Sequence, residues 1–99
     1  MTHDEVLNIA KAYADAVRRT MDTTAIFLYG SHAKGTARED SDIDIAVVVD
    51  DIPGDYLNEV SKLWGLTMEI SDIIEPILLT EKDNQHYFNQ IVYKTSIRL

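Results

Sequence analysis

Hydrophobic and polar positions recur with different periods along the chain, and each change of period marks an expected element. Apolar residues spaced three or four apart predict an amphipathic helix that ends near Thr20. Thr2 and Glu5 at its start can form a capping box. Residues 25–29 and 43–49 are short apolar runs rich in β-forming side chains, which indicates two buried strands.

A second helical pattern follows the break around residues 50–54. Asp55 is the expected N-terminal cap, and the helix is expected to end near Gly65. Its spacing predicts an inward face made of Tyr56, Leu57, Val60, Leu63 and Trp64.

The last third of the chain predicts a strand, a helix and a short final strand. Residues 73–79 form the third expected strand, and Pro76 predicts an edge position because proline has no N–H to donate to a ladder. Residues 81–94 have a helical pattern, and residues 97–99 can add a further strand.

These elements predict an α/β (α+β) fold with a small mixed sheet of three or four strands flanked by helices. Residues 1–99 are expected to form a single domain. The first two strands can pair antiparallel across the loop that joins them. The third can lie parallel to the second through a right-handed crossover.

Composition narrows the class of protein. The 99 residues include no cysteine, so disulfides and thiolate metal sites are excluded. No signal peptide or membrane span is visible, so a cytoplasmic protein is expected, and the oligomeric state stays open. The net charge of −8 disfavours nucleic acid as a partner. It favours Mg²⁺ and a basic protein partner, although acidity can also serve solubility alone.

The candidate chemistry lies between the first two strands. Gly30 and Ser31 end the first strand, and glycine allows a phosphate to approach the backbone while serine donates hydrogen bonds. Asp42 and Asp44 open the second strand on one face, with Cβ atoms roughly 7 Å apart. Two like charges at that separation favour a bound divalent cation, Mg²⁺ above all. Lys34 in the loop can hold phosphate or remain solvated.

A third carboxylate comes from the next strand or the turn before it. Glu75 would lie beside the start of the second strand, while Asp72 just precedes its own strand. Glu75 can complete a metal site, face solvent or pair with Arg98. His32 is expected at the surface without a role.

The segment from Gly30-Ser31 to Asp42-Ile43-Asp44 resembles the signature of the DNA polymerase beta-like nucleotidyltransferases, in particular the minimal stand-alone bacterial and archaeal members. Ile74-Glu75-Pro76 also resembles a family element. The final segment does too, with Ser96 where the family has glycine.

The resemblance implies a polymerase beta palm-like fold. Its catalytic and metal-binding residues would be Asp42, Asp44 and Glu75, holding two Mg²⁺ ions, and its nucleotide-binding residues would include Gly30 and Ser31. The expected reaction transfers a nucleoside monophosphate, AMP from ATP first, to a hydroxyl group. Minimal members often act as antitoxins that adenylylate a tyrosine of a HEPN-domain toxin.

Other functions remain as alternatives. The domain could neutralise a partner by contact alone, with a vestigial metal site, although the motif residues are all present. Nucleotide addition to RNA would call for a basic surface or an added domain. Modification of an antibiotic would usually call for a second domain.

Overall fold

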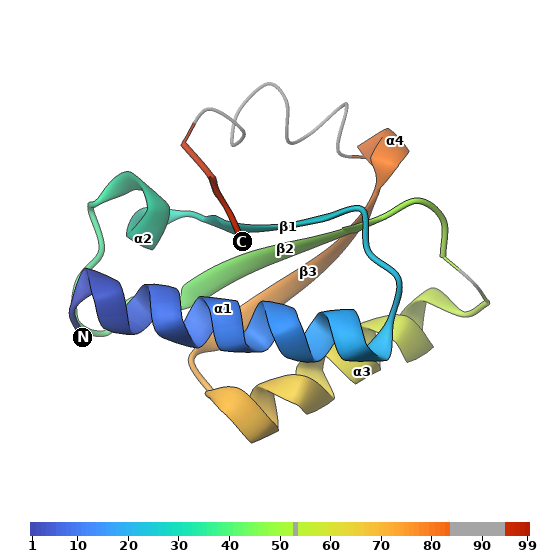
Figure 1. Cartoon of the computed structure of the whole chain (residues 1–99), viewed down its shortest axis with the longest axis horizontal. Coiled ribbons are helices and arrows are strands. Elements are labelled where there is room, and N and C mark those ends of the chain that lie inside the picture. The colour runs from blue at the N-terminus through green and yellow to red at the C-terminus, as the bar shows by residue number, and fades with distance from the viewer. Residues whose placement is uncertain (53, 84–94) are drawn as a thin grey trace.

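The computed structural model describes residues 1–52, 54–83 and 95–99, in which helices and strands alternate (Figure 1). The elements are α1 (His3–Thr20), β1 (Ala25–Tyr29), α2 (Ser31–Lys34), β2 (Ile43–Val49), α3 (Tyr56–Ile70), β3 (Ile74–Thr80), α4 (Glu81–Asp83) and β4 (Ile97–Arg98). The bounds expected for the first helix and the first two strands are confirmed, and β3 begins and ends one residue later than expected.

The strands form one mixed sheet in the order β3-β2-β1-β4. β1 is antiparallel to β2 and to β4, and β2 is parallel to β3. The predicted neighbours and the predicted edge position of β3 are therefore confirmed. Because α3 joins β2 to β3, the parallel pair is connected by the helical crossover that such pairs need.

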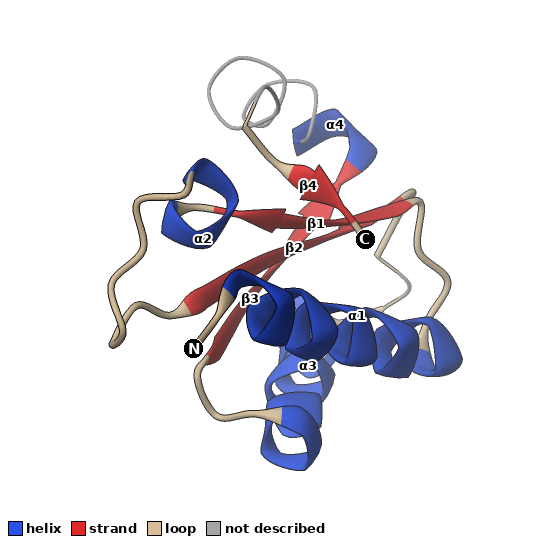
Figure 2. Ribbon diagram, turned by 60° about the vertical axis from the view of Figure 1, so that its left-hand side comes forward, coloured by secondary structure: helices blue, strands red, loops and turns tan. Residues whose placement is uncertain are grey.

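α1 and α3 cover the same face of the sheet (Figure 2). Alternate residues of each strand point to this face and form the main core with them. The two helices are also joined directly, since the buried Tyr13 hydroxyl donates a hydrogen bond of 2.7 Å to the Leu63 carbonyl oxygen. This packing leaves the other sheet face to carry the polar residues of β2 and β3.

Helix α3 differs from its prediction in length and in orientation. It continues past Gly65 to Ile70, because Gly65 keeps helical geometry rather than a positive φ and later residues still pack on the core. The residues that face inward share a spacing of four: Glu59, Leu63 and Thr67. The predicted inward face is therefore only partly right. Leu63 is buried and Val60 is half-buried, but Tyr56, Leu57 and Trp64 are exposed.

Three smaller expectations concern the chain ends. Thr2 caps α1 by accepting from the Glu5 amide, and its own hydroxyl donates to the Glu5 side chain. Among the described residues no non-glycine has a positive φ, so Ser96 carries no such strain. The expected last helix falls mostly on residues 84–94, which lie outside the described residues. No helix in the described ranges is long and apolar enough to cross a membrane.

Candidate active site

Three polar side chains form a row across neighbouring strands. Tyr29 of β1 is in register with Asp44 of β2, and Asp44 is in register with Glu75 of β3. Residues directly opposite one another in this way have their Cβ atoms about 5 Å apart. Since Ile43 and Ile45 belong to the core against α1 and α3, the row lies on the other face of the sheet. The predicted meeting of Glu75 with the start of β2 is confirmed.

Gly30 lies directly against this row. Its φ is +76°, a conformation that side chains rarely adopt. A Cβ atom added there would lie 2.2 Å from the Asp44 Oδ2 atom. Two features therefore favour glycine at position 30: the backbone conformation and the close approach of the Asp44 carboxylate.

The loop after Gly30 is held by its own hydrogen bonds. Ser31 opens the short helix α2, and its carbonyl oxygen accepts from the Thr36 amide at 3.0 Å. Further along, the Ser41 hydroxyl accepts from the Arg38 amide at 2.8 Å. Ser41 therefore braces the loop just before Asp42. The Lys34 side chain is exposed and has no ion pair within the described part of the chain.

His32 is the residue that sequence reasoning missed. The expectation of a surface histidine is wrong, because only 8% of His32 is exposed. Its Nε2 atom lies 3.2 Å from the Ser41 carbonyl oxygen, so the tautomer that donates from Nε2 fits the contact. The imidazole thus connects the start of the loop to its end. In the sequence, the available signal was that His32 directly follows Ser31. In the structure, His32 lies on the four-residue helix α2, which contacts β1.

The site concentrates negative charge. Burial, then the nearby charges of Glu75 and Asp42, raise the pKa of Asp44, while His32 opposes the shift. A hydrogen bond between the Asp44 and Glu75 carboxyl groups adds to the rise. Burial, followed by the charges of Asp44 and Glu75, raises the pKa of Tyr29 to about 12. Tyr29 therefore remains a neutral phenol at neutral pH.

The other candidates for the third carboxylate and its partner lie apart from the row. Arg98 is on β4, at the opposite edge of the sheet from β3, so the alternative pairing of Glu75 with Arg98 is wrong. Asp72 precedes β3 and is exposed. Glu75 is also exposed, as an edge glutamate would be, but it lies opposite Asp44.

The carboxylates suit a hard cation without forming a complete cage for one. No group of three or more His, Asp and Glu side chains among residues 1–52, 54–83 and 95–99 is arranged to hold a metal ion. Mg²⁺, however, is commonly held by one or two carboxylates together with substrate phosphates and water. Asp44 and Glu75 provide such a pair, with Asp42 near enough to affect the pKa of Asp44. The donor set therefore fits Mg²⁺ that arrives with a nucleotide.

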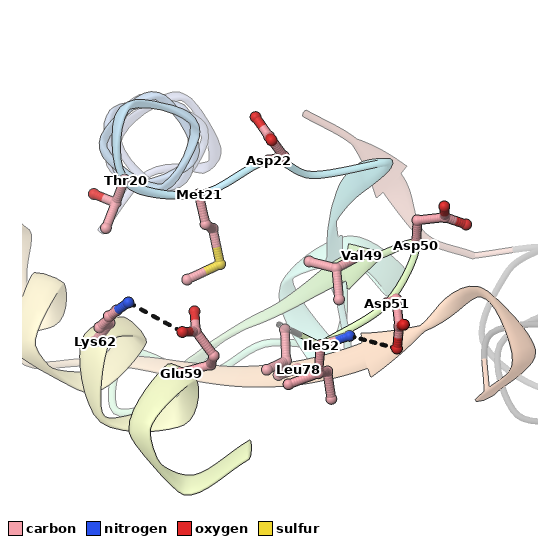
Figure 3. Close-up of a pocket in the computed structure, with 10 residues that line it drawn as sticks. All are labelled: Thr20, Met21, Asp22, Val49, Asp50, Asp51, Ile52, Glu59, Lys62 and Leu78. Carbon is pink, nitrogen blue, oxygen red and sulfur yellow. Dashed lines mark hydrogen bonds and ion pairs between the residues drawn. The ribbon is translucent and has the colours of Figure 1, made fainter. Parts of the chain in front are cut away.

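A cavity of about 600 Å³ does not coincide with this site. It lies at the other end of the sheet and is lined by residues such as Met21, Val49 and Glu59 (Figure 3). A smaller hollow of about 250 Å³ lies beside the loop and includes His32 and Arg38. We locate the candidate chemistry at the carboxylate row, because reactive groups converge there. The volume of a cavity does not by itself indicate a reaction.

A mixed sheet with a glycine turn set against paired carboxylates defines a nucleotidyltransferase class of protein. The sequence profile of the polymerase beta nucleotidyltransferase family matches residues 3–99. The chain therefore belongs to this family, and the predicted resemblance is confirmed.

Among individual proteins, the chain is similar to the protein adenylyltransferase MntA of Thermococcus cleftensis. The two are 36% identical over 53 residues, which make up 54% of this chain and 54% of that protein. The similarity thus spans about half the length of the curated relative.

Solved structures share the fold. A Sulfolobus solfataricus protein described as a nucleotidyltransferase aligns over 97% of this chain and 80% of its own, with a TM-score of 0.72 and 21% identity. A toxin–antitoxin structure with AMP-PNP aligns over 99% of this chain and 72% of its own, with a TM-score of 0.62 and 21% identity. At these identities the two structures support the predicted nucleotidyltransferase fold.

Proposed function

We propose that the protein transfers a nucleoside monophosphate, AMP from ATP first, to a hydroxyl group of a partner protein. The observation that carries this proposal is the in-register pair of Asp44 and Glu75 with Gly30 pressed against it. Family membership supports the reaction class, and the similarity to a protein adenylyltransferase supports a protein acceptor. A bond forms between the acceptor oxygen and the α-phosphorus, the α–β phosphoanhydride bond breaks, and pyrophosphate leaves.

The nucleotide would bind where β1 ends. Gly30 keeps the backbone open to the phosphates, and Ser31 donates hydrogen bonds to their oxygens. Lys34 is exposed in the same loop and adds positive charge toward the triphosphate. His32 positions this loop rather than contacting the reacting atoms, because it is buried against Ser41.

Asp42, Asp44 and Glu75 would hold two Mg²⁺ ions brought in with the nucleotide. Metal ions held by these carboxylates would supply a lower pKa for the acceptor hydroxyl and positive charge beside the phosphates. The like charges that raise the pKa of Asp44 are the reason that a cation is favoured at this position. Catalysis in this chemistry is mostly positioning and charge neutralisation.

We assign to Glu75 the role of accepting the proton of the attacking hydroxyl. It is exposed at the edge strand, where an acceptor can reach it, whereas Asp44 is half-buried beside Gly30. Tyr29 in the same row stays protonated at neutral pH because its pKa is about 12. We therefore assign the acceptor hydroxyl to a partner protein rather than to Tyr29.

The acceptor we propose is a tyrosine of a HEPN-type toxin, with this protein as its antitoxin. A toxin–antitoxin structure shares the fold, and the net charge of −8 suits a basic protein partner better than RNA. The interior of the cell is the expected compartment, since ATP and Mg²⁺ are available there.

Label transfer tests the proposal. The protein is incubated with α-labelled ATP, Mg²⁺ and a lysate of its own organism, beside an Asp42→Asn/Asp44→Asn variant. An Asp15→Asn/Glu69→Gln variant removes two charges from exposed helix faces and serves as the matched control. We expect one protein band to be labelled by the wild type and the control, with AMP attached to a tyrosine through its phosphate.

Other outcomes identify the alternatives. Label in RNA would replace the protein acceptor with nucleotide addition to an RNA end. If none of the four NTPs gives label while the protein still captures a partner, the domain acts by contact alone. Label that persists in the Asp42→Asn/Asp44→Asn variant would exclude the carboxylates as the reactive centre.

A further inference from the structure

A cavity of about 600 Å³ lies at the end of the sheet opposite the carboxylate row (Figure 3). It lies where α1 ends, where β2 and β3 end and where α3 begins. Its lining consists of Thr20, Met21, Asp22, Val49, Asp50, Asp51, Ile52, Glu59, Lys62 and Leu78, and we call it the far-end cavity. We infer that the far-end cavity binds the side chain of an arginine from a partner protein.

The inner wall of the far-end cavity is apolar. Met21, Val49 and Leu78 line it, and the Met21 thioether reaches down into the space toward α3 (Figure 3). An arginine side chain has an apolar stem and a planar, weakly hydrated head that packs on such surfaces. The more strongly hydrated lysine ammonium would lose more on entering the same space.

Glu59 supplies the buried anion. Only 7% of Glu59 is exposed, and its carboxylate points into the far-end cavity (Figure 3). Its Oε1 atom accepts from the Lys62 Nζ atom at 3.0 Å. The other oxygen, Oε2, has no hydrogen-bond partner among the described residues. Oε2 faces the cavity (Figure 3) and can accept from a group that enters it, and a guanidinium group can supply two parallel N–H donors to one carboxylate.

The rim selects for positive charge. Asp22, Asp50 and Asp51 are exposed around the far-end cavity, and its lining contains one basic residue, Lys62. This excess of negative charge attracts a cation and repels phosphate or carboxylate ligands. Lys62 is half-exposed, so its flexible side chain can move toward solvent when a second cation arrives.

The position of the far-end cavity favours a macromolecule over a small ligand. Val49 and Asp44 are five residues apart on one strand, which corresponds to roughly 17 Å. A protein can insert an arginine at one end of the sheet and present a hydroxyl group at the other. This connection rests on the proposed function, whereas the binding of a guanidinium group in the far-end cavity does not.

The methionine methyl groups provide a direct test. The chain has three methionines, of which Met21 lines the far-end cavity while Met1 and Met68 are exposed elsewhere. The protein carrying ¹³C-labelled methionine methyl groups is titrated with acetyl-Gly-Arg-Gly-amide, with no nucleotide present. The control peptide has citrulline in place of arginine, which keeps the shape and removes the charge. We expect a saturable shift of the Met21 signal on the order of millimolar peptide, with the arginine peptide only.

Two variants should change the affinity in opposite directions. Glu59→Gln keeps the shape of the buried side chain and should weaken peptide binding by about tenfold or more, because it removes the charge that the guanidinium group meets. Lys62→Gln removes the competing cation and should strengthen binding several-fold. If Glu59→Gln fails to fold, Lys62→Gln still decides the question, since a merely structural ion pair predicts no gain in affinity.

Three results would overturn the inference. The Met21 signal could remain unchanged at saturating peptide, the citrulline peptide could shift it equally, or Lys62→Gln could weaken binding. Because no nucleotide is involved, each of these results leaves the label-transfer experiment untouched. A failure of nucleotide transfer likewise leaves the peptide titration valid.

Discussion

The acidic side chains near the two ends of β2 have opposite kinds of neighbour. At its first residues Asp44 lies opposite Glu75, and the proximity of like charges contributes to a raised pKa of Asp44. Beyond its last residues the buried Glu59 carries its own counterion, Lys62, at 3.0 Å. One end of β2 thus pairs a carboxylate with a lysine side chain, whereas the other end brings carboxylates together, and this second arrangement favours a bound cation between them.

The largest expected effect is a loss of activity when the carboxylate row itself is changed. Glu75→Gln should lower the rate of label transfer by about 10²–10³-fold, because it removes both a metal ligand and the proton acceptor. Asp72→Asn is the matched control, since Asp72 is an exposed carboxylate just before the same strand. Initial rates at saturating ATP and Mg²⁺ measure the difference. Equal loss in both variants would make Glu75 no more than one of several surface charges.

The next effect concerns the glycine that faces the row. Gly30→Ala should lower the rate of label transfer by up to about 10²-fold and the free energy of unfolding by about 3 kcal/mol, because strain and a clash with Asp44 act together. Gly35→Ala is the control for strain alone. Gly35 has a φ of +77°, but an added Cβ would meet nothing within 4 Å.

Urea unfolding and label transfer are measured for both glycine variants. We expect Gly35→Ala to lose about 1–2 kcal/mol and to keep most of its activity. The close approach of Gly30 to Asp44 would lose its importance if the two variants behaved alike.

A smaller effect is expected at the loop that carries the nucleotide site. His32→Ala removes the contact with Ser41 and should cost about 1–2 kcal/mol of stability. Since His32 positions the loop, KM for ATP should rise more than kcat falls. His3→Ala changes an exposed histidine at the start of α1 and should alter neither constant. A fall in kcat alone would instead place His32 in contact with the reacting groups.

The smallest effect is a pH dependence of the metal-free protein. The pKa of Asp44 is raised by folding, so its contribution is fully present below the unfolded pKa of about 4 and is lost as pH rises through the folded pKa. Asp44→Asn lacks this titration. Relative to Asp44→Asn, the wild type should therefore lose about 0.5–1 kcal/mol between pH 4 and pH 7.

Thermal or urea unfolding in EDTA measures this difference. Added Mg²⁺ with a nonhydrolysable ATP analogue should then stabilise the wild type more than Asp44→Asn. A stability difference that does not vary with pH would show that the carboxylates do not interact as described.

Short-range sequence signals predicted most of the fold. The Thr2 cap, the apolar strands and the single helix between β2 and β3 each depend on local patterns or on chain length. These patterns predicted that β2 lies between β1 and β3, but they did not predict that β4 lies beside β1. The same reasoning placed Glu75 beside the start of β2, because the first residues of neighbouring parallel strands lie at the same end of a sheet. The resemblance added the expected chemistry rather than the geometry.

The features that sequence missed depend on tertiary context. α3 presents Glu59 inward and Trp64 outward, since a helix with apolar residues on more than one side can be rotated by its neighbours. His32 is buried only because the loop closes over it. The far-end cavity is lined by four separate segments of the chain, and no local sequence pattern predicts that they lie together.

Pro76 has a consequence for how the protein behaves at high concentration. The Ile43 amide donates to the Ile73 carbonyl oxygen, so the backbone groups of Ile73 point toward β2. Because the backbone groups of successive residues point to opposite sides of a strand, positions 74, 76 and 78 point to the outer edge of β3. Proline has no amide hydrogen, and the ladder that another chain would extend along this edge is interrupted at its middle. The strand that carries Glu75 is thereby protected from polymerising edge to edge, even while Glu75 itself stays open to an acceptor.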